Sequence, residues 1–204
     1  MNAWQPTVFV VDDDASVLKA LARLLRSAGL NVVAFASPQA FLEQRDPDAP
    51  GCLVLDVAMP GLDGLELQQA LAAQGGAPPV VFLTGHGDIP MSVRAMKQGA
   101  IDFLTKPVHE DDLLAAVHAA IEKDRMFRHA CAELNVIRQR LATLTPRERE
   151  VLKHVVAGKL NKQIAADLGT VEKTIKVHRA RLMAKLQVRS LAELVRLSEK
   201  GGVK

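Results

Sequence analysis

Residues 7–14 of the chain have the sequence TVFVVDDD, in which five mostly apolar residues are followed at once by three aspartates. A continuous apolar run of this length is typical of a strand buried on both faces of a parallel sheet. Similar runs lie at residues 30–35, 51–56, 79–84 and 102–105. Helical patterns alternate with them, at residues 15–27, 38–43, 64–73 and 89–98 and from residue 110 onward. This alternation predicts an α/β fold with a five-stranded, doubly wound parallel sheet.

The charge of the chain is unevenly divided. Residues 1–122 hold 7 Lys and Arg against 15 Asp and Glu, a net charge of −8, whereas residues 123–204 hold 19 against 8, a net charge of +11. An acidic half and a basic half indicate two domains with different partners. Because Lys and Arg neutralise phosphates, the basic half favours a nucleic acid as its partner.

The basic half has a helical pattern throughout. The sequence TPRE at residues 145–148 is a capping box with Pro at the first helical position. Ser190 begins a second capping box, SLAE at residues 190–193. Asn161 is expected to cap a short helix, and a longer basic helix is expected over residues 172–186. A short helix, a turn containing Gly and a longer basic helix are the layout of a helix-turn-helix motif. Ile175, Leu182 and Leu186 are expected to face its small core.

The segment between the halves predicts a helix rather than a flexible linker, because residues 123–143 contain neither Pro nor Gly. Its apolar residues recur at spacings of 3 and 4, and they are Phe127, Ala130, Leu134, Ile137 and Leu141. We expect a stiff arm, continuous with the helix that begins near residue 110, that pairs with a second copy or packs on its own domains.

Composition excludes several classes of protein. No apolar stretch is long enough to cross a membrane, and the N-terminus lacks the layout of a signal peptide, so we expect a cytoplasmic protein without a membrane partner. Cys52 and Cys131 match no metal-ligand spacing and are expected to be reduced. The chain has no Tyr and one Trp, which argues against stacking of unpaired bases.

Polar residues follow the predicted strands where each strand ends. Asp12 and Asp13 follow the first strand, Asp56 ends the third, Thr84 ends the fourth and Lys106 follows the fifth. Sites in open parallel sheets form at the carboxyl ends of strands, so these side chains are expected to converge. Several carboxylates this close need a counter-charge, and Mg²⁺ is the usual partner of carboxylates and phosphates. The predicted chemistry is phosphoryl transfer onto a carboxylate.

Three neighbouring residues are interpreted differently. Asp14 is expected to act as a helix cap, and Pro107 makes the peptide bond before it a candidate for the cis form. His86 is a single histidine in a Gly-rich loop, so it is expected to belong to a moving loop and not to a metal site.

These motifs resemble those of a response-regulator receiver domain over about residues 7–122. The matching stretches are VVDD at 10–13, LDVAMPGLDG at 55–64, LTGH at 83–86 and FLTKP at 103–107. The stretch GHGDIPM at 85–91 resembles the NarL/FixJ family in particular. The resemblance implies a flavodoxin-like fold with Asp56 as the phospho-acceptor.

The same resemblance implies roles for the residues around Asp56. It implies Asp13 as a direct Mg²⁺ ligand, Asp12 as a supporting ligand and the backbone carbonyl of Ala58 as a further one. Thr84 and Lys106 would contact the phosphoryl group. Phe103 stands at the switch position of the family, where an aromatic residue is found, and a phenylalanine there has no hydroxyl group.

The basic half resembles a LuxR-type helix-turn-helix domain over about residues 140–200. The matching stretches are LTPREREVL at 144–152, NKQIA at 161–165, KTIKVH at 173–178 and KL at 185–186. The predicted DNA-contacting residues are Lys162, Lys173, Thr174, Lys176, Val177, Arg179, Ala180, Arg181 and Lys185. Of these, Lys173, Lys176, Val177 and Ala180 are expected to face the bases, whereas Lys162, Arg179, Arg181 and Lys185 are expected to contact phosphates. The family usually has an apolar residue and then Ser before the recognition helix, where this chain has Thr170 and Val171. The cap is therefore expected to shift to Thr170 or to be weaker.

The sequence thus predicts a receiver domain at 6–122, a helical linker at 123–139 and a DNA-binding domain at 140–204. We interpret the chain as a two-component response regulator that acts as a transcription factor. Phosphorylation by a sensor histidine kinase would control homodimerisation and binding to double-stranded DNA, with RNA polymerase as a further partner. The chain is not expected to be an enzyme beyond slow self-dephosphorylation.

Two alternatives stand beside this interpretation. A haloacid-dehalogenase-type phosphatase has an Asp-x-Asp motif after its first strand, and Asp12 and Asp14 have that spacing. Such enzymes have a larger domain with later acidic ligands, where this chain has a basic helical domain. The second alternative is a constitutive DNA-binding protein with a non-signalling receiver, against which the complete acidic set argues.

Overall fold

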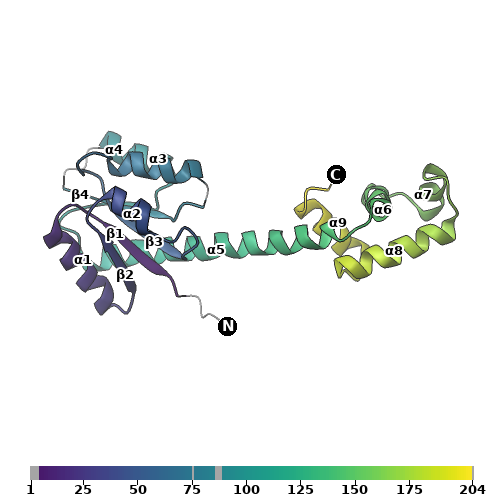
Figure 1. Ribbon diagram of the computed structural model, residues 1–204, viewed down its shortest axis with the longest axis horizontal. Helices are drawn as coiled ribbons and strands as arrows, with labels where there is room; N and C mark the ends of the chain where they lie inside the picture. The colour runs from purple at the N-terminus through teal and green to yellow at the C-terminus, as the bar shows by residue number, and fades with distance from the viewer. Residues whose placement is uncertain (1–4, 75, 86–88, 204) are drawn as a thin grey trace. The chain divides into compact units, whose positions relative to one another are not determined.

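The structure, a computed structural model, describes residues 5–74, 76–85 and 89–203 (Figure 1). The prediction for His86 lies outside these residues. The chain divides into two compact units, Met1–Phe127 and Arg128–Lys204. Each is described separately below as the N-terminal and the C-terminal unit. The division falls inside the segment that the sequence predicts as a linker.

The described part of the N-terminal unit contains a five-stranded parallel sheet in the order β2-β1-β3-β4-β5. The strands are β1 (Thr7–Val11), β2 (Asn31–Phe35), β3 (Gly51–Asp56), β4 (Val80–Thr84) and β5 (Asp102–Thr105). The helices between and after them are α1 (Ala15–Ser27), α2 (Pro38–Gln44), α3 (Gly64–Gln74), α4 (Ile89–Lys97) and α5 (Glu110–Ala142). The predicted α/β fold is confirmed.

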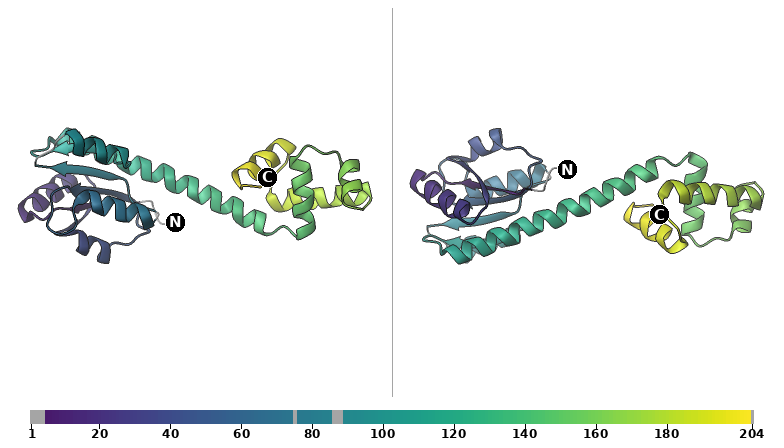
Figure 2. Two further views of the ribbon diagram at one scale, coloured as in Figure 1. Left: turned by 90° about the horizontal axis from the view of Figure 1, so that it is seen from above. Right: turned by 90° about the horizontal axis from the view of Figure 1, so that it is seen from below.

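Helices cover both faces of the sheet, so it is doubly wound (Figure 2). On one face, Leu21 of α1 and Val117 of α5 pack in one core with Val10 of β1. On the other face, Phe41 of α2 and Leu71 of α3 pack in a second core, together with apolar residues of β1, β3 and β4. Alternate residues of each central strand therefore serve opposite cores.

The edge strands differ from the continuous burial that the sequence analysis assumed. Strands β1, β3 and β4 are buried along their whole length. In β2 only Val32 and Phe35 are buried, and β5 is partly buried at most. An edge strand has one neighbour and incomplete helix cover, so its apolar composition does not translate into burial.

The start of β3 is held against α5 by a buried hydrogen bond. The backbone N–H of Gly51 donates to Oδ2 of Asp124 at 2.9 Å. Gly51 has a φ of +143°, and a Cβ atom there would lie 1.8 Å from the carbonyl oxygen of Thr7. Only glycine fits this approach of β1 to β3.

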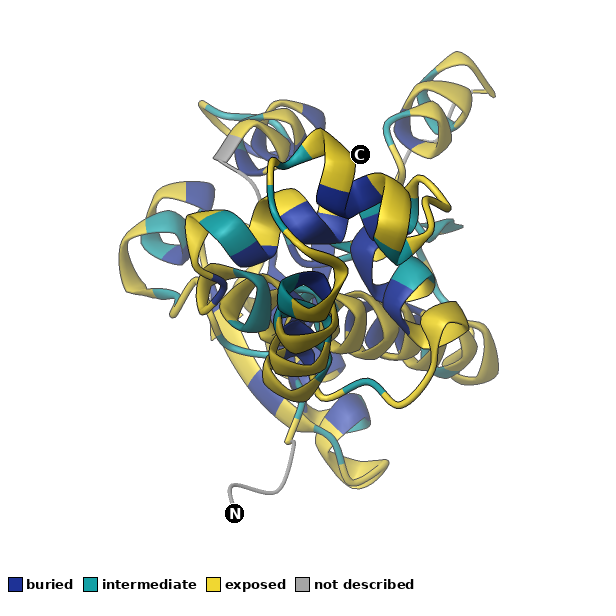
Figure 3. Cartoon of the chain, turned by 90° about the vertical axis from the view of Figure 1, so that its right-hand side faces the viewer, coloured by how far each residue is buried: buried dark blue, intermediate teal, exposed yellow. Residues whose placement is uncertain are grey.

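The C-terminal unit is helical. Its helices are α6 (Pro146–Val156), α7 (Asn161–Asp167), α8 (Glu172–Leu186) and α9 (Leu191–Lys200), joined by the last turns of α5. As predicted, Ile175, Leu182 and Leu186 are fully buried in its core. Ile137 and Leu141 of α5 pack in the same core, so this end of the predicted arm belongs to the C-terminal unit. Figure 3 shows how buried and exposed segments alternate along the helices.

The first helix cap of this unit agrees with the sequence and the second does not. Thr145 Oγ1 accepts from the N–H of Glu148, whose carboxylate accepts from the N–H of Thr145, so the predicted capping box is present. Asn161 is not the cap of α7, because Leu160 holds that position and its N–H donates to the side chain of Gln163. The expectation for Asn161 was wrong by one residue.

Helix α8 begins with a bare cap. Val171 is its N-cap residue, and no side-chain hydrogen bond caps the helix there. The cap does not move to Thr170, so the weaker of the two expected arrangements is present. Within the described residues, no helix is both long and apolar enough to span a membrane.

Candidate functional site

An acidic site lies at the carboxyl ends of the parallel strands. The pairing of β1 with β3 sets Val11 beside Leu55, so Asp12 and Asp56 follow at neighbouring strand ends. Lys106 Nζ donates to Asp12 Oδ2 at 2.6 Å and to Asp56 Oδ1 at 2.7 Å. Asp12 is 1% exposed and Asp56 5% exposed. One ammonium group therefore bridges two buried carboxylates, as the convergence of strand ends predicts.

Asp13 completes a group of three carboxylates. One oxygen atom from each of Asp12, Asp13 and Asp56 lies within 4.8 Å of the other two. Asp12 and Asp56 are buried whereas Asp13 is exposed, so the group opens toward solvent. Hard divalent cations prefer clustered oxygen ligands of this kind. The site can hold a divalent cation.

Burial and hydrogen bonding have opposing effects on the pKa values of Asp56 and Lys106. Burial raises the pKa of Asp56, hydrogen bonding to the Lys106 ammonium opposes that rise, and the nearby charges of Asp12 and Asp13 add to it. Burial alone would lower the pKa of Lys106, but its hydrogen bonds to both carboxylates raise the pKa above the ordinary value. Lys106 is therefore a fixed positive charge beside a carboxylate that favours an added counter-charge.

Thr84 ends β4 beside the site, and Phe103 lies within the neighbouring strand β5. Thr84 is 1% exposed, and its carbonyl oxygen accepts from the backbone N–H of Lys106 at 2.7 Å. The peptide bond between Lys106 and Pro107 is cis, as the sequence suggested. The partly buried ring of Phe103 packs on Phe82 with the ring centroids 6.2 Å apart.

Two further predicted residues lie in the loops that follow β1 and β3. Ala58 is exposed two residues beyond Asp56. Asp14 is the N-cap of α1, as predicted, and its carboxylate accepts from the N–H groups of Ser16 and Val17. Hydrogen bonds from the Ser16 side chain and from these N–H groups lower the pKa of Asp14. The carboxylate of Asp14 thus caps α1.

Gly64 is part of the site although the sequence analysis gave it no role. A Cβ atom on Gly64 would lie 2.4 Å from the backbone carbonyl oxygen of Asp56. Its N–H also donates to the carbonyl oxygen of Val57 at 3.0 Å. The first residue of α3 therefore touches the backbone of the candidate acceptor, and the only signal in the sequence is a glycine eight residues after Asp56.

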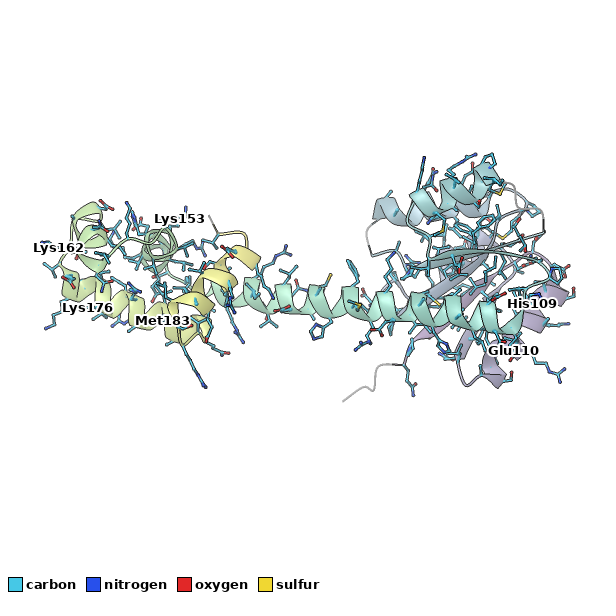
Figure 4. The ribbon with its side chains drawn as sticks, turned by 180° about the vertical axis from the view of Figure 1, so that it is seen from behind. His109, Glu110, Lys153, Lys162, Lys176 and Met183 are labelled. Atoms are coloured by element: carbon cyan, nitrogen blue, oxygen red, sulfur yellow. The ribbon has the colours of Figure 1, made fainter. Side chains whose placement is uncertain are left out.

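A second candidate site is the exposed side of α8. Lys173, Lys176, Val177 and Ala180 are exposed, and their spacing places them on the side opposite the buried Ile175. Figure 4 labels Lys176 on α8 and Lys162, also exposed, on α7. A helix with this face can enter a major groove, where Lys donates to guanine and small apolar groups meet a thymine methyl group.

Not all of the predicted DNA contacts are equally free to bind phosphate. Arg181 is exposed, and Thr174 is half-buried. The half-buried Arg179 donates to Asn161 Oδ1 at 2.9 Å. Lys185 Nζ donates to Glu148 Oε2 at 2.6 Å and to the carbonyl oxygen of Thr143 at 3.2 Å. Contacts of Arg179 and Lys185 within the protein compete with their predicted phosphate roles.

The partner of Lys185 is a buried carboxylate. Glu148 is 3% exposed and also belongs to the capping box of α6. The hydrogen bond from Lys185 lowers the pKa of Glu148, burial opposes this, and hydrogen bonds from Thr145 assist it. Lys185 thus ties α8 to the start of α6, a structural role that the sequence analysis did not assign.

Comparison with known proteins identifies the two domains that carry these candidate sites. Residues 8–118 match the response regulator receiver domain, and residues 142–198 match the luxR family of bacterial regulatory proteins. The chain belongs to the response-regulator family. This response regulator is 50% identical over 196 residues to nodulation protein W of Bradyrhizobium diazoefficiens. The aligned residues cover 96% of this chain and 86% of that protein.

Two further relatives cover both domains of this response regulator. The transcriptional regulatory protein FixJ of Bradyrhizobium diazoefficiens is 44% identical over 196 residues, or 96% of each chain. The solved structure of the response regulator StyR superposes on this structure with a TM-score of 0.88, covering 96% of this chain and 99% of that one. The two sequences are 52% identical. The resemblance inferred from the sequence is confirmed, and the protein is a transcriptional response regulator with a LuxR-type DNA-binding domain.

Proposed function

We propose that Asp56 accepts a phosphoryl group from a sensor histidine kinase and that this modification controls dimerisation and DNA binding. The observation that carries the proposal is the bridge from Lys106 to both Asp12 and Asp56. It leaves Asp56 buried, ionisable and next to a fixed cation at the open end of the sheet. These are the conditions for a nucleophilic carboxylate whose product carries additional negative charge.

In the transfer, a carboxylate oxygen of Asp56 attacks the phosphorus of a phosphohistidine. The new O–P bond forms as the P–N bond breaks, and the electron pair of that bond stays on the imidazole nitrogen, which binds a proton. Lys106 and Thr84 would contact the oxygens of the phosphoryl group. The acceptor is consumed in each transfer and restored by hydrolysis, so the chain acts as a switch and not as a turnover enzyme.

The carboxylate set fits Mg²⁺. Asp12 and Asp13, together with the backbone carbonyl of Ala58 and with Asp56 itself, would hold the ion. When bound, Mg²⁺ neutralises charge on the phosphoryl oxygens.

Two observations weigh against the alternatives. The second Asp of the Asp-x-Asp spacing of a haloacid-dehalogenase-type phosphatase would be Asp14, but here Asp14 caps α1 through bonds to Ser16 and Val17. A constitutive DNA-binding protein would not require Lys106 to bridge two buried carboxylates.

The receiver also carries a surface suited to pairing. Helix α4 exposes Ile89, Val93 and Met96, at spacings of 4 and 3 along one side, and Ile89 is 80% exposed. Exposed apolar side chains gathered on one helix are typical of an interaction surface. We assign this surface to a second phosphorylated receiver, because a helix-turn-helix domain binds tightly as a dimer on two half-sites. The proposed partner DNA is double-stranded, and the proposal includes a cytoplasmic location and RNA polymerase as a further partner.

The test compares wild type with Asp56→Asn, which keeps the shape and removes the nucleophile. Wild type is expected to be labelled by a small phosphodonor only when Mg²⁺ is present, and Asp56→Asn is expected to remain unlabelled. Sedimentation after beryllofluoride treatment with Mg²⁺ should show a dimer for wild type and a monomer for the variant. Equal labelling of the two proteins would overturn the assignment of Asp56.

A further inference from the structure

The middle turns of α5 expose apolar side chains that neither core uses. Met126 is 65% exposed and Phe127 is 57% exposed, unusual values for large apolar residues in the interior of a long helix. Ala130 is exposed and Leu134 is half-buried, and neither belongs to the apolar clusters of the two units. The predicted apolar stripe is therefore split: Ile137 and Leu141 are used by the C-terminal core, and the part before them is uncovered.

This uncovered part has the spacing of a coiled-coil seam. Phe127, Ala130 and Leu134 follow one another at intervals of 3 and 4, which are the a, d and a positions of a heptad. We refer to these three residues as the α5 seam. The seam ends at Leu134, since the next d position is Ile137, which is buried in the C-terminal core.

The charges beside the seam fit a parallel copy of the same helix. With Phe127 at a, Glu133 is a g position and Arg138 is the e position five residues later. In a parallel pair, the g position of one helix faces the e position of the other. Glu133 of each copy would therefore pair with Arg138 of the other copy, which gives two such ion pairs in the dimer. Arg138 is exposed, and Glu133 forms a half-exposed ion pair with Lys200, a weak type of contact.

We propose that the α5 seam is a second dimer contact, occupied by the α5 seam of another copy in parallel orientation. The inference rests on the proposed pairing of phosphorylated receivers. Three seam residues bury far less than the roughly 1,200 Å² of a stable interface, so the seam does not hold two chains together alone. Paired receivers raise the local concentration of the second seam, and the seam closes only then. Phosphorylation thereby sets the register of the two α5 helices that lead into the DNA-binding domains.

Disulfide trapping tests the contact in the full-length chain. Ala130→Cys is made in a Cys131→Ser background, and Asn135→Cys, at an exposed b position outside the seam, is the matched control. Cys52 does not interfere, since it is fully buried and burial raises the pKa of its thiol to about 12. Disulfides require Cα atoms within about 4.4–6.8 Å, a separation that paired d positions provide and b positions do not.

After beryllofluoride treatment with Mg²⁺, the Ala130→Cys chain is expected to cross-link about tenfold faster than the Asn135→Cys chain. Without treatment, both should cross-link slowly. Adding Arg138→Glu should slow the treated Ala130→Cys chain, and combining Arg138→Glu with Glu133→Arg should restore its rate. Equal rates for the two cysteine positions in a sample that sediments as a dimer would overturn the seam and leave receiver pairing intact. A treated sample that stays monomeric would overturn the proposed pairing and the seam together.

Discussion

The backbone N–H of Lys106 donates to the carbonyl oxygen of Thr84 at 2.7 Å, so the two residues are tied together at neighbouring strand ends. The lysine side chain continues from this anchor to Asp12 and Asp56. A change in charge at Asp56 therefore acts on Lys106, which shares its backbone hydrogen bond with Thr84. Phosphorylation of Asp56 can favour dimerisation only if the phosphorylated state has different contacts at the pairing surface from the unphosphorylated state.

Lys106→Ala should separate phosphorylation from its consequence. Asp56 keeps its nucleophilic oxygen, so we expect the variant to be labelled by a small phosphodonor in the presence of Mg²⁺. The variant loses charged hydrogen bonds worth about 1.5–3 kcal/mol each. The association constant of its labelled form for dimerisation should therefore fall about tenfold or more. Labelling and sedimentation of the same sample measure the two effects. Lys19→Ala, an exposed lysine of α1, is the control and should match wild type.

DNA binding should distinguish residues that contact bases from those that contact phosphates. Lys176→Ala should reduce discrimination between specific and random sites by roughly 1–3 kcal/mol. Arg181→Ala should weaken both kinds of site about equally and reduce the slope of log affinity against log salt by about 0.9. Titrations of both DNAs at several salt concentrations measure this. If the two variants lose affinity for both DNAs in the same proportion, the two roles are wrongly assigned.

Glu148→Gln should destabilise the C-terminal unit and flatten its response to acid. Because the pKa of Glu148 is lowered in the folded chain, its contribution to stability is present above the ordinary carboxyl pKa and is lost as pH falls through the folded value. At neutral pH the variant should lose about 1–3 kcal/mol, since Lys185 keeps its charge without a charged partner. Urea unfolding at neutral and acidic pH should show a gap between the proteins that narrows in acid. A constant gap would contradict the assignment.

Val171→Ser should stabilise the protein. Ser at an N-cap position accepts a hydrogen bond from the first turn of the helix, and α8 has no such bond, so a gain of about 0.5–2 kcal/mol is expected in urea unfolding. The matched control is Val177→Ser, another exposed valine of the same region but inside α8, which should not stabilise. A similar gain at both positions would mean that the effect does not come from the cap.

Most of the fold and of the acidic site could be predicted from the sequence because both follow from local patterns. The strand-end positions of Asp12, Asp56, Thr84 and Lys106 are visible once the apolar runs are found, and parallel pairing brings strand ends together regardless of further detail. The cap at Asn161 was predicted wrongly because composition favours Asn over Leu at an N-cap position, whereas Leu160 holds that position in the structure. In that case Gln163 satisfies the N–H of Leu160 from inside the helix.

Contacts between distant segments could not be predicted in the same way. Lys185 looks like any other basic residue of α8, and its contact with Glu148 depends on how α8 packs against α6, 37 residues away in sequence. The bond from Gly51 to Asp124 spans 73 residues and has no periodic signal. The splitting of the apolar stripe of α5 also depends on where the C-terminal core ends, which is a property of packing and not of spacing.

The use of Ile137 and Leu141 by the C-terminal core has a practical consequence for dissecting the gene. The luxR-family match begins at residue 142, so a fragment cloned from that boundary would omit both residues. Leu141 also lies against Gly201, where a Cβ atom would come within 2.4 Å of its side chain, so the end of the chain would lose its support as well. A fragment that starts at Arg128 retains these contacts. Weak expression of the shorter fragment would then reflect the missing core residues Ile137 and Leu141, and not an instability of the complete DNA-binding domain.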